Sequence, residues 1–140
     1  MSDLSVFFAQ NAVAETTEDI VVSLRFRDAA GEPVAWKLRS MTEEENEACR
    51  KAATKQVKGK NGMRVPETNS DEYMANLVAA SIAYPNVKDA ELQKSYGVMG
   101  AGPLLKKMLL PGEYALLIQK VQELNGFQRD MSELVDEVKN

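Results

Sequence analysis

Residues 96–127 read YGVMGAGPLLKKMLLPGEYALLIQKVQELNGF, and this apolar stretch is the most informative part of the chain. Proline and glycine are both unfavourable inside a helix, so the Pro-Gly pair at 111–112 predicts a break between two leucine-rich helices. The Asn-Gly pair at 125–126 predicts the end of the second helix, with Phe127 folding back on Val121 in a Schellman-type closure. The stretch contains no catalytic group. It is therefore built for packing, either within this protein's own core or against another protein.

Residues 20–39 alternate between apolar and polar side chains on both sides of a Gly/Pro turn, which is the pattern of a β-hairpin. The turn falls at residues 28–33. Because a lone hairpin is marginal in water, its apolar face is expected to pack on a helix or on a second copy of the chain. The predicted face consists of Val22, Leu24, Phe26, Trp36 and Leu38.

Helix-start signals follow the hairpin. Thr42 with glutamate three residues later has the form of a capping box, and it predicts a polar helix over about residues 42–56. Ser70 followed by two acidic residues, Asp71 and Glu72, favours the first turn of another helix, which Pro85 stops. A shorter helix over residues 88–96 is then ended by a glycine.

A further helix is predicted near each end of the chain. Leu4, Phe7 and Phe8 stand at helical spacing after an N-cap residue. The final helix is predicted to begin at Asp130, because the apolar residues after it recur at i, i+3, i+4 and i+7.

Residues 57–69, VKGKNGMRVPETN, have the composition of a connecting loop, with two glycines and a proline. Four basic residues lie between Lys55 and Arg64. They suit a small anion or a nucleic acid, but single-stranded nucleic-acid sites usually add aromatic side chains, and none is present here. The segment is therefore predicted to be a flexible, solvated loop.

These elements predict an α+β fold, mainly α-helical, with an N-terminal β-hairpin. The length of 140 residues predicts a single domain over residues 1–140. Its N-terminal helix and hairpin occupy about residues 1–40, and its helical part occupies about residues 41–140.

Composition excludes several functional classes. The chain has no histidine and one cysteine, so a Ser-His-Asp triad, a Cys-His pair and a Cys/His zinc site are all impossible. The net charge of −4 argues against general binding to nucleic-acid phosphates. No apolar run is long enough for a membrane span, and no basic segment suggests a signal peptide. No cofactor or metal is expected, and the expected compartment is a reducing cytoplasm.

The lone cysteine, Cys49, has two interpretations. It is either a small buried apolar group or a reactive thiol activated by Arg50 and Lys51. The first interpretation is favoured, because these two residues are weak candidates for activating a thiol.

Three quoted segments carry a resemblance to a known family. They are FFAQNAV at residues 7–13, PVAWKLRSMTEEENEACRKAAT at residues 33–54 and, most specifically, LLKKMLLPGEYALLIQKVQELNGF at residues 104–127. In this order, with an acidic C-terminal segment, they resemble the XkdN-like family of tail assembly chaperones from phages and prophages of Gram-positive hosts. The resemblance covers most of the chain and rests on packing residues rather than on chemical groups.

The resemblance implies a non-catalytic protein of the bacterial host cytoplasm that acts during tail assembly and is absent from the mature virion. Such proteins are thought to bind the long tape measure protein, keep it soluble and help recruit tail tube subunits. In many tail systems the same gene also yields a longer frameshifted product. Self-association through apolar helix faces is expected, since coating a long partner requires many copies.

Two other classes compete with the chaperone. A structural virion or head–tail joining protein shares the phage context but stays in the particle. An enzyme would need the carboxylates of residues 43–47, which are better explained as a solvated helix N-terminus.

A long helical partner predicts recognition through apolar anchors at helical spacing. The candidate partner-binding residues flank the Pro-Gly break, and the flexible methionine among them suits a surface that accepts varied sequences. Lys106 and Lys107 could add electrostatic steering at the rim. The same residues could instead form the core of the domain. They are Leu105, Met108, Leu109, Tyr114, Leu117 and Ile118.

Overall fold

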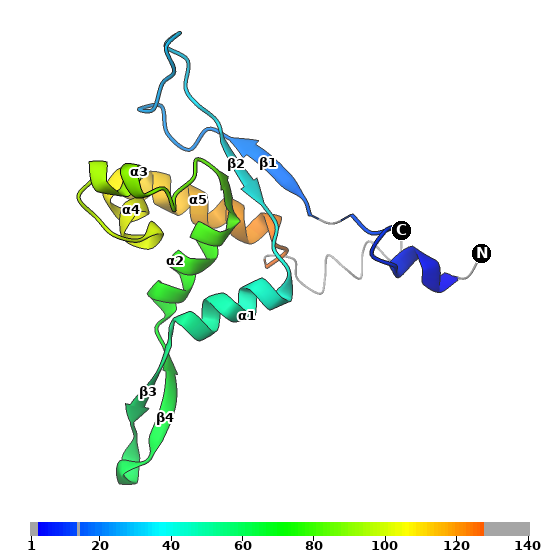
Figure 1. The fold of residues 1–140 in the computed structure, drawn as a ribbon, viewed down its shortest axis with the longest axis vertical. Helices are drawn as coiled ribbons and strands as arrows, with labels where there is room; N and C mark the ends of the chain where they lie inside the picture. Colours follow the sequence, from blue (N-terminus) through cyan, green and yellow to red (C-terminus); the bar gives the residue numbers. More distant parts are fainter. Residues whose placement is uncertain (1–2, 14, 128–140) are drawn as a thin grey trace.

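The computed structural model describes residues 3–13 and 15–127, and Figure 1 shows the course of the chain. The fold is α+β, as predicted, with two small sheets in the described part. The strands are β1 (Thr17–Ile20), β2 (Trp36–Arg39), β3 (Thr54–Lys58), β4 (Arg64–Thr68) and β5 (Ile82–Tyr84). The α-helices are α1 (Glu43–Ala52), α2 (Ser70–Ser81), α3 (Ala90–Ser95), α4 (Ala101–Met108) and α5 (Pro111–Leu124). Two 3-10 helices, η1 (Asp3–Phe7) and η2 (Lys60–Gly62), complete the set.

The larger sheet has the order β1-β2-β5, and both pairings are antiparallel. Ile20 lies opposite Trp36, and Leu38 lies opposite Ile82. Strand β5 follows α2 directly, so no loop separates this helix from the sheet. The sequence analysis missed β5, because it expected α2 to continue toward Pro85.

The predicted N-terminal hairpin is only partly correct. The first strand is β1, which ends at Ile20, and residues 21–35 form a long connection with one isolated bridge between Arg27 and Pro33. A local turn interrupts the strand, because the Ser23 hydroxyl accepts a hydrogen bond from the Arg25 backbone N–H at 3.1 Å.

The predicted apolar face of this region is also only partly correct. Val22, Trp36 and Leu38 are buried. Phe26 is partly buried and packs against the core beside the ring of Trp36. Leu24 was placed wrongly, since 64% of it is exposed. The turn after Ser23 removes the period-two alternation on which that assignment depended.

The prediction of a loop at residues 57–69 is wrong. Strands β3 and β4 pair antiparallel from Thr54 opposite Thr68 to Lys58 opposite Arg64, and η2 forms the turn between them. Asn61 and Gly62 both have positive φ, as a tight hairpin turn requires. This hairpin extends away from the rest of the fold (Figure 1), and the predicted helix at 42–56 ends at Ala52 to give way to it.

The predicted helix ends are largely confirmed. The Thr42 capping box is present, with the Thr42 hydroxyl accepting from the Glu45 N–H at 3.2 Å. Leu109 and Leu110 are extended, so α4 and α5 are separate helices. The N–H groups of Gly126 and Phe127 donate to the carbonyls of Glu123 and Gln122 and form the predicted Schellman closure.

The two predicted terminal helices have different outcomes. The N-terminal one is the 3-10 helix η1 rather than an α-helix, and Leu4, Phe7 and Phe8 are all exposed. The helix predicted from Asp130 lies outside the described residues.

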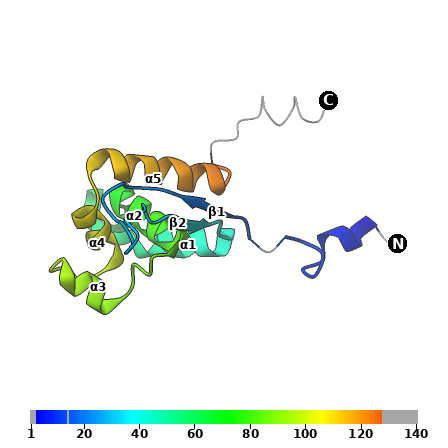
Figure 2. The same ribbon diagram turned by 90° about the horizontal axis from the view of Figure 1, so that it is seen from above.

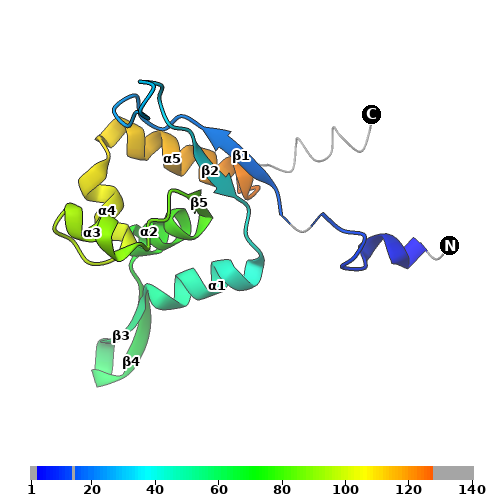
Figure 3. The same cartoon turned by 45° about the horizontal axis from the view of Figure 1, so that its top comes forward.

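Helix α2 lies at the centre of the fold. Helices α1, α4 and α5 pack on it, as Figure 3 shows. Its Leu77 and Val78 join Leu104, Leu117 and Val121 in one fully buried cluster. The two leucine-rich helices of the opening stretch therefore pack largely within this protein's own core.

Replacing Trp36 by alanine is expected to lower the free energy of unfolding by about 3–5 kcal/mol. The reason is that Trp36 is only 2% exposed and its ring packs beside that of Phe26, at 6.5 Å between centroids. Leu24→Ala is the matched control and is expected to change the value by about 0.5 kcal/mol or less. Denaturant titration measures both, and a loss below about 1 kcal/mol for Trp36→Ala would contradict the burial.

Candidate partner-binding surfaces

The predicted partner-binding residues lie together around the corner between α4 and α5. Leu105, Met108, Leu109 and Leu117 are buried in the core, whereas Tyr114 and Ile118 are partly exposed. Four of the six predicted side chains are thus covered by the protein's own core. Only Tyr114 and Ile118 of the predicted set remain accessible to a partner.

Leu110 is a neighbour that the sequence analysis did not select. It is 54% exposed and occupies the N-cap position of α5. Together with Tyr114 and Ile118 it forms an i, i+4, i+8 series, which places the three on one side of α5. We call Leu110, Tyr114 and Ile118 the corner ridge.

The α4–α5 corner is fixed by an ion pair from the long connection after β1. Arg25 Nη2 lies 2.6 Å from Glu113 Oε1 and donates at 2.7 Å to the carbonyl oxygen of Met108. Glu113 Oε1 also accepts from the Leu110 N–H at 2.8 Å. The Arg25 guanidinium, aided by hydrogen bonds from Ser23 and from the Leu110 backbone, lowers the pKa of Glu113 to about 2.

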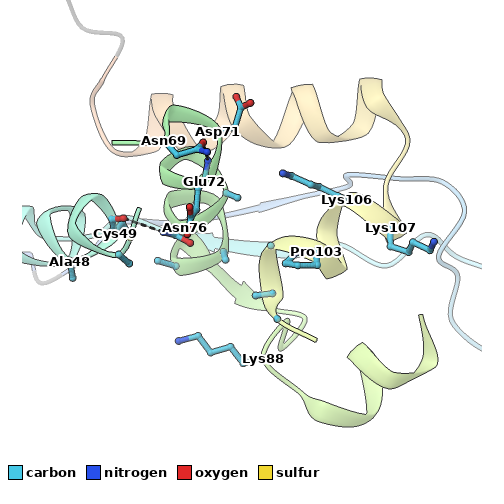
Figure 4. A pocket seen from close by; sticks show the side chains of 17 residues that line it. Ala48, Cys49, Asn69, Asp71, Glu72, Asn76, Lys88, Pro103, Lys106 and Lys107 are labelled. Atoms are coloured by element: carbon cyan, nitrogen blue, oxygen red, sulfur yellow. Dashed lines mark hydrogen bonds between the residues drawn. The ribbon is translucent and has the colours of Figure 1, made fainter. Parts of the chain in front are cut away.

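A second surface is a groove of about 1100 Å³ between α1, α2 and α4 (Figure 4). A Cβ added to Gly102 would lie 3.5 Å from the Cβ of Ala75, so α4 approaches α2 closely at this point. Asn76 Nδ2 donates to the carbonyl oxygen of Cys49 at 3.1 Å and fixes α2 against α1. Because alanines supply much of the lining, the helices leave open space above their line of contact.

Opposite charges border this groove. Lys88, Lys106 and Lys107 lie along it from the α3 and α4 side, and Asp71 and Glu72 lie at the first turn of α2. The ion pairs of the described residues include none of these five side chains. The lysines are exposed and available to an acidic partner.

Cys49 is buried at the edge of the groove, and this burial raises the pKa of its thiol. A raised pKa disfavours the reactive thiolate. The interpretation of Cys49 as a small buried apolar group is therefore confirmed.

The described residues offer neither a metal site nor a membrane-spanning helix. Among residues 3–13 and 15–127, no group of three His, Cys, Asp or Glu side chains is arranged to hold a metal ion. In the same part of the chain, no helix has the length and apolar character needed to cross a membrane.

A family model described as phage XkdN-like tail assembly chaperone protein matches residues 4–139. The chain belongs to this family. The XkdN protein of the phage-like element PBSX of Bacillus subtilis (strain 168) is 30% identical to it over 141 residues, which cover 99% of this chain and 94% of that protein. The uncharacterized protein YqbN of the same strain is 32% identical, over 99% of this chain and 93% of YqbN.

The fold of this XkdN-like chaperone agrees with a solved structure. The crystal structure of YqbN superposes with a TM-score of 0.78 at 26% identity, and the match covers 91% of this chain and 99% of that one. The predicted family is thus confirmed, and it associates the chain with phage tail assembly.

Glu113→Gln is expected to flatten the acid dependence of stability of this XkdN-like chaperone. The Glu113 pKa is about 2 in the folded state, compared with an ordinary value of 4.5. A lowered pKa adds stability that is fully present above about pH 4.5 and is lost as the pH falls toward 2. The wild type should therefore lose more stability than Glu113→Gln over this interval, as measured by denaturant titration at several pH values.

Glu67→Gln is the control for this measurement, because Glu67 lies on the exposed strand β4 and forms no ion pair with another described residue. It should follow the wild-type curve. Parallel curves for the wild type and Glu113→Gln would show that the Arg25 ion pair does not stabilise the corner.

Proposed function

We propose that this protein binds the tape measure protein of its phage or prophage, keeps it soluble and promotes assembly of the tail tube around it. The observation that carries this proposal is the family match over residues 4–139, nearly the whole chain. The protein acts in the host cytoplasm as a non-catalytic binding protein and leaves before the virion is complete. Tail tube subunits are its second partner.

The corner ridge is the proposed contact for the tape measure protein. Leu110, Tyr114 and Ile118 present partly exposed apolar surface at the spacing that a helical partner matches. The ion pair between Arg25 and Glu113 holds the corner in place, so little conformational entropy is lost when a partner binds. The buried candidates, such as Leu105 and Leu117, support the ridge from below rather than contact the partner.

Coexpression with the tape measure protein of the same phage or prophage tests the proposal. The soluble fraction of the tape measure protein should rise when the wild-type chain is present, and the two should copurify. Leu110→Ser combined with Ile118→Ser should abolish both effects, because the change removes apolar contact area from the ridge. Leu109 is left unchanged, because it is buried and its loss would disturb the core.

Met63→Ser is the matched control, since Met63 is an exposed apolar residue on the β3–β4 hairpin, away from the corner. It should behave as wild type. Should the double variant unfold in thermal melts, Leu110→Ser alone provides the test, because its side chain is more than half exposed. Unchanged copurification with a folded ridge variant would place the contact elsewhere.

The alternative, a structural virion or head–tail joining protein, gives a different result in purified particles. Mass spectrometry should detect no peptide of this chain in finished virions if it acts as a chaperone. Its presence at a fixed copy number would favour the structural role.

A further inference from the structure

The N-terminal arm, residues 3–13, presents an unusual amount of apolar surface. Phe7 is 77% exposed, and Leu4, Val6 and Phe8 are also exposed. In Figures 1 and 2 the arm extends away from the helices rather than packing over them. Exposed apolar clusters of this kind mark surfaces that another molecule covers.

Hydrogen bonds form within the arm, and others join the chain after it to the residue that follows β2. The Phe8 carbonyl oxygen accepts from the Asn11 N–H at 2.9 Å, and Asn11 Nδ2 donates to the carbonyl oxygen of Ser5 at 2.7 Å. At its base, Thr16 and Ser40 exchange two hydrogen bonds, Ser40 N–H to Thr16 O at 2.7 Å and Thr16 N–H to Ser40 Oγ at 2.8 Å. An arm with internal hydrogen bonds loses less entropy on docking than an unstructured tail does.

Charge distinguishes the arm from the groove between α1, α2 and α4. Asp3 is the charged residue of the arm, and the chain has no lysine or arginine before Arg25. The groove is bordered by three lysines, Lys88, Lys106 and Lys107, and by two acids, Asp71 and Glu72, so its lining carries a net positive charge. Complementary charges of this kind steer association and fix its register.

The size of the groove also suits a segment of polypeptide. It is an open surface groove of about 1100 Å³, which is room enough for a few large side chains of a peptide segment. Its alanine-rich lining leaves room for the large side chains that the arm presents.

We propose that the N-terminal arm of one copy docks in the α1/α2/α4 groove of a second copy, with Phe7 and Phe8 over the alanines and Asp3 toward the lysines. Arm and groove are different surfaces, so each copy gives one arm and receives another. Such a contact joins copies head to tail and need not close into a ring.

Cross-linking between two differently marked copies tests the proposal. Cys49→Ala first provides a cysteine-free background. One copy then carries Phe8→Cys, and the other carries Ala52→Cys, an exposed position in the groove. Mixing under oxidising conditions should give a disulfide-linked heterodimer, and Ala115→Cys, an exposed alanine of α5 outside the groove, should give several-fold less product.

Self-association of the chain alone provides the second measurement. Light scattering should show a mass that rises with concentration, and Phe7→Ser with Phe8→Ser should weaken this association by more than about tenfold. Thermal melts should be unchanged, because both side chains are exposed in the monomer.

Three outcomes would overturn the proposal: equal cross-linking to residues 52 and 115, association that the arm substitutions do not alter, or, in a further variant that carries both Phe8→Cys and Ala52→Cys in one chain, a disulfide that forms only within that chain. The last outcome would mean that the arm folds onto its own groove. No tape measure protein is present in either measurement, so a failure here is distinct from a failure of the proposed function.

Discussion

The burial of helix α2 is the constraint on which the rest of the structure depends. Ala75, Leu77, Val78 and Ser81 are all buried, so the helix is covered over a wide arc by α1, α4 and α5. Its last residue leads directly into β5, which couples the helical layer to the sheet. Asn125 completes this coupling, because it donates to the Ser81 hydroxyl at 3.2 Å and accepts from the backbone N–H before α1 at 2.7 Å. One asparagine thus joins the ends of α2 and α5 to the start of α1.

Local signals predicted the helices well, because caps and breaks depend on a few adjacent residues. The Thr42 capping box and the Schellman closure at Gly126 both formed as expected. The strands were harder to predict from the sequence. The pair Asn61-Gly62 is a strong hairpin signal, but the glycines and proline around it suggested a loop. The side chains of β4 are all exposed, so this strand lacks the alternation of apolar and polar residues that marks a strand packed on a core. Leu24 was misplaced because the Ser23–Arg25 turn broke a pattern that otherwise looked continuous.

The candidate surfaces were only partly predictable for a different physical reason. An apolar helix stripe has the same pattern whether it covers a core or a partner, and only the packing shows that Leu105 and Leu117 are covered while Leu110 is not. The groove has no sequence signature, since its alanines and lysines come from separate helices. The phenylalanines of the arm were visible in the sequence, but the apolar spacing at Leu4, Phe7 and Phe8 predicted only a helix and could not show that these side chains are exposed.

The edges of the three-stranded sheet bear on whether copies of the chain can aggregate by strand pairing. Strand β1 forms one edge, and its exposed Glu18 and Asp19 place two charges where another strand would have to pair. Strand β5 at the other edge has three residues, too few for a stable new partner strand. Charged and short edges both discourage edge-to-edge aggregation. Neither edge of the sheet therefore favours uncontrolled β-sheet growth between copies of the chain.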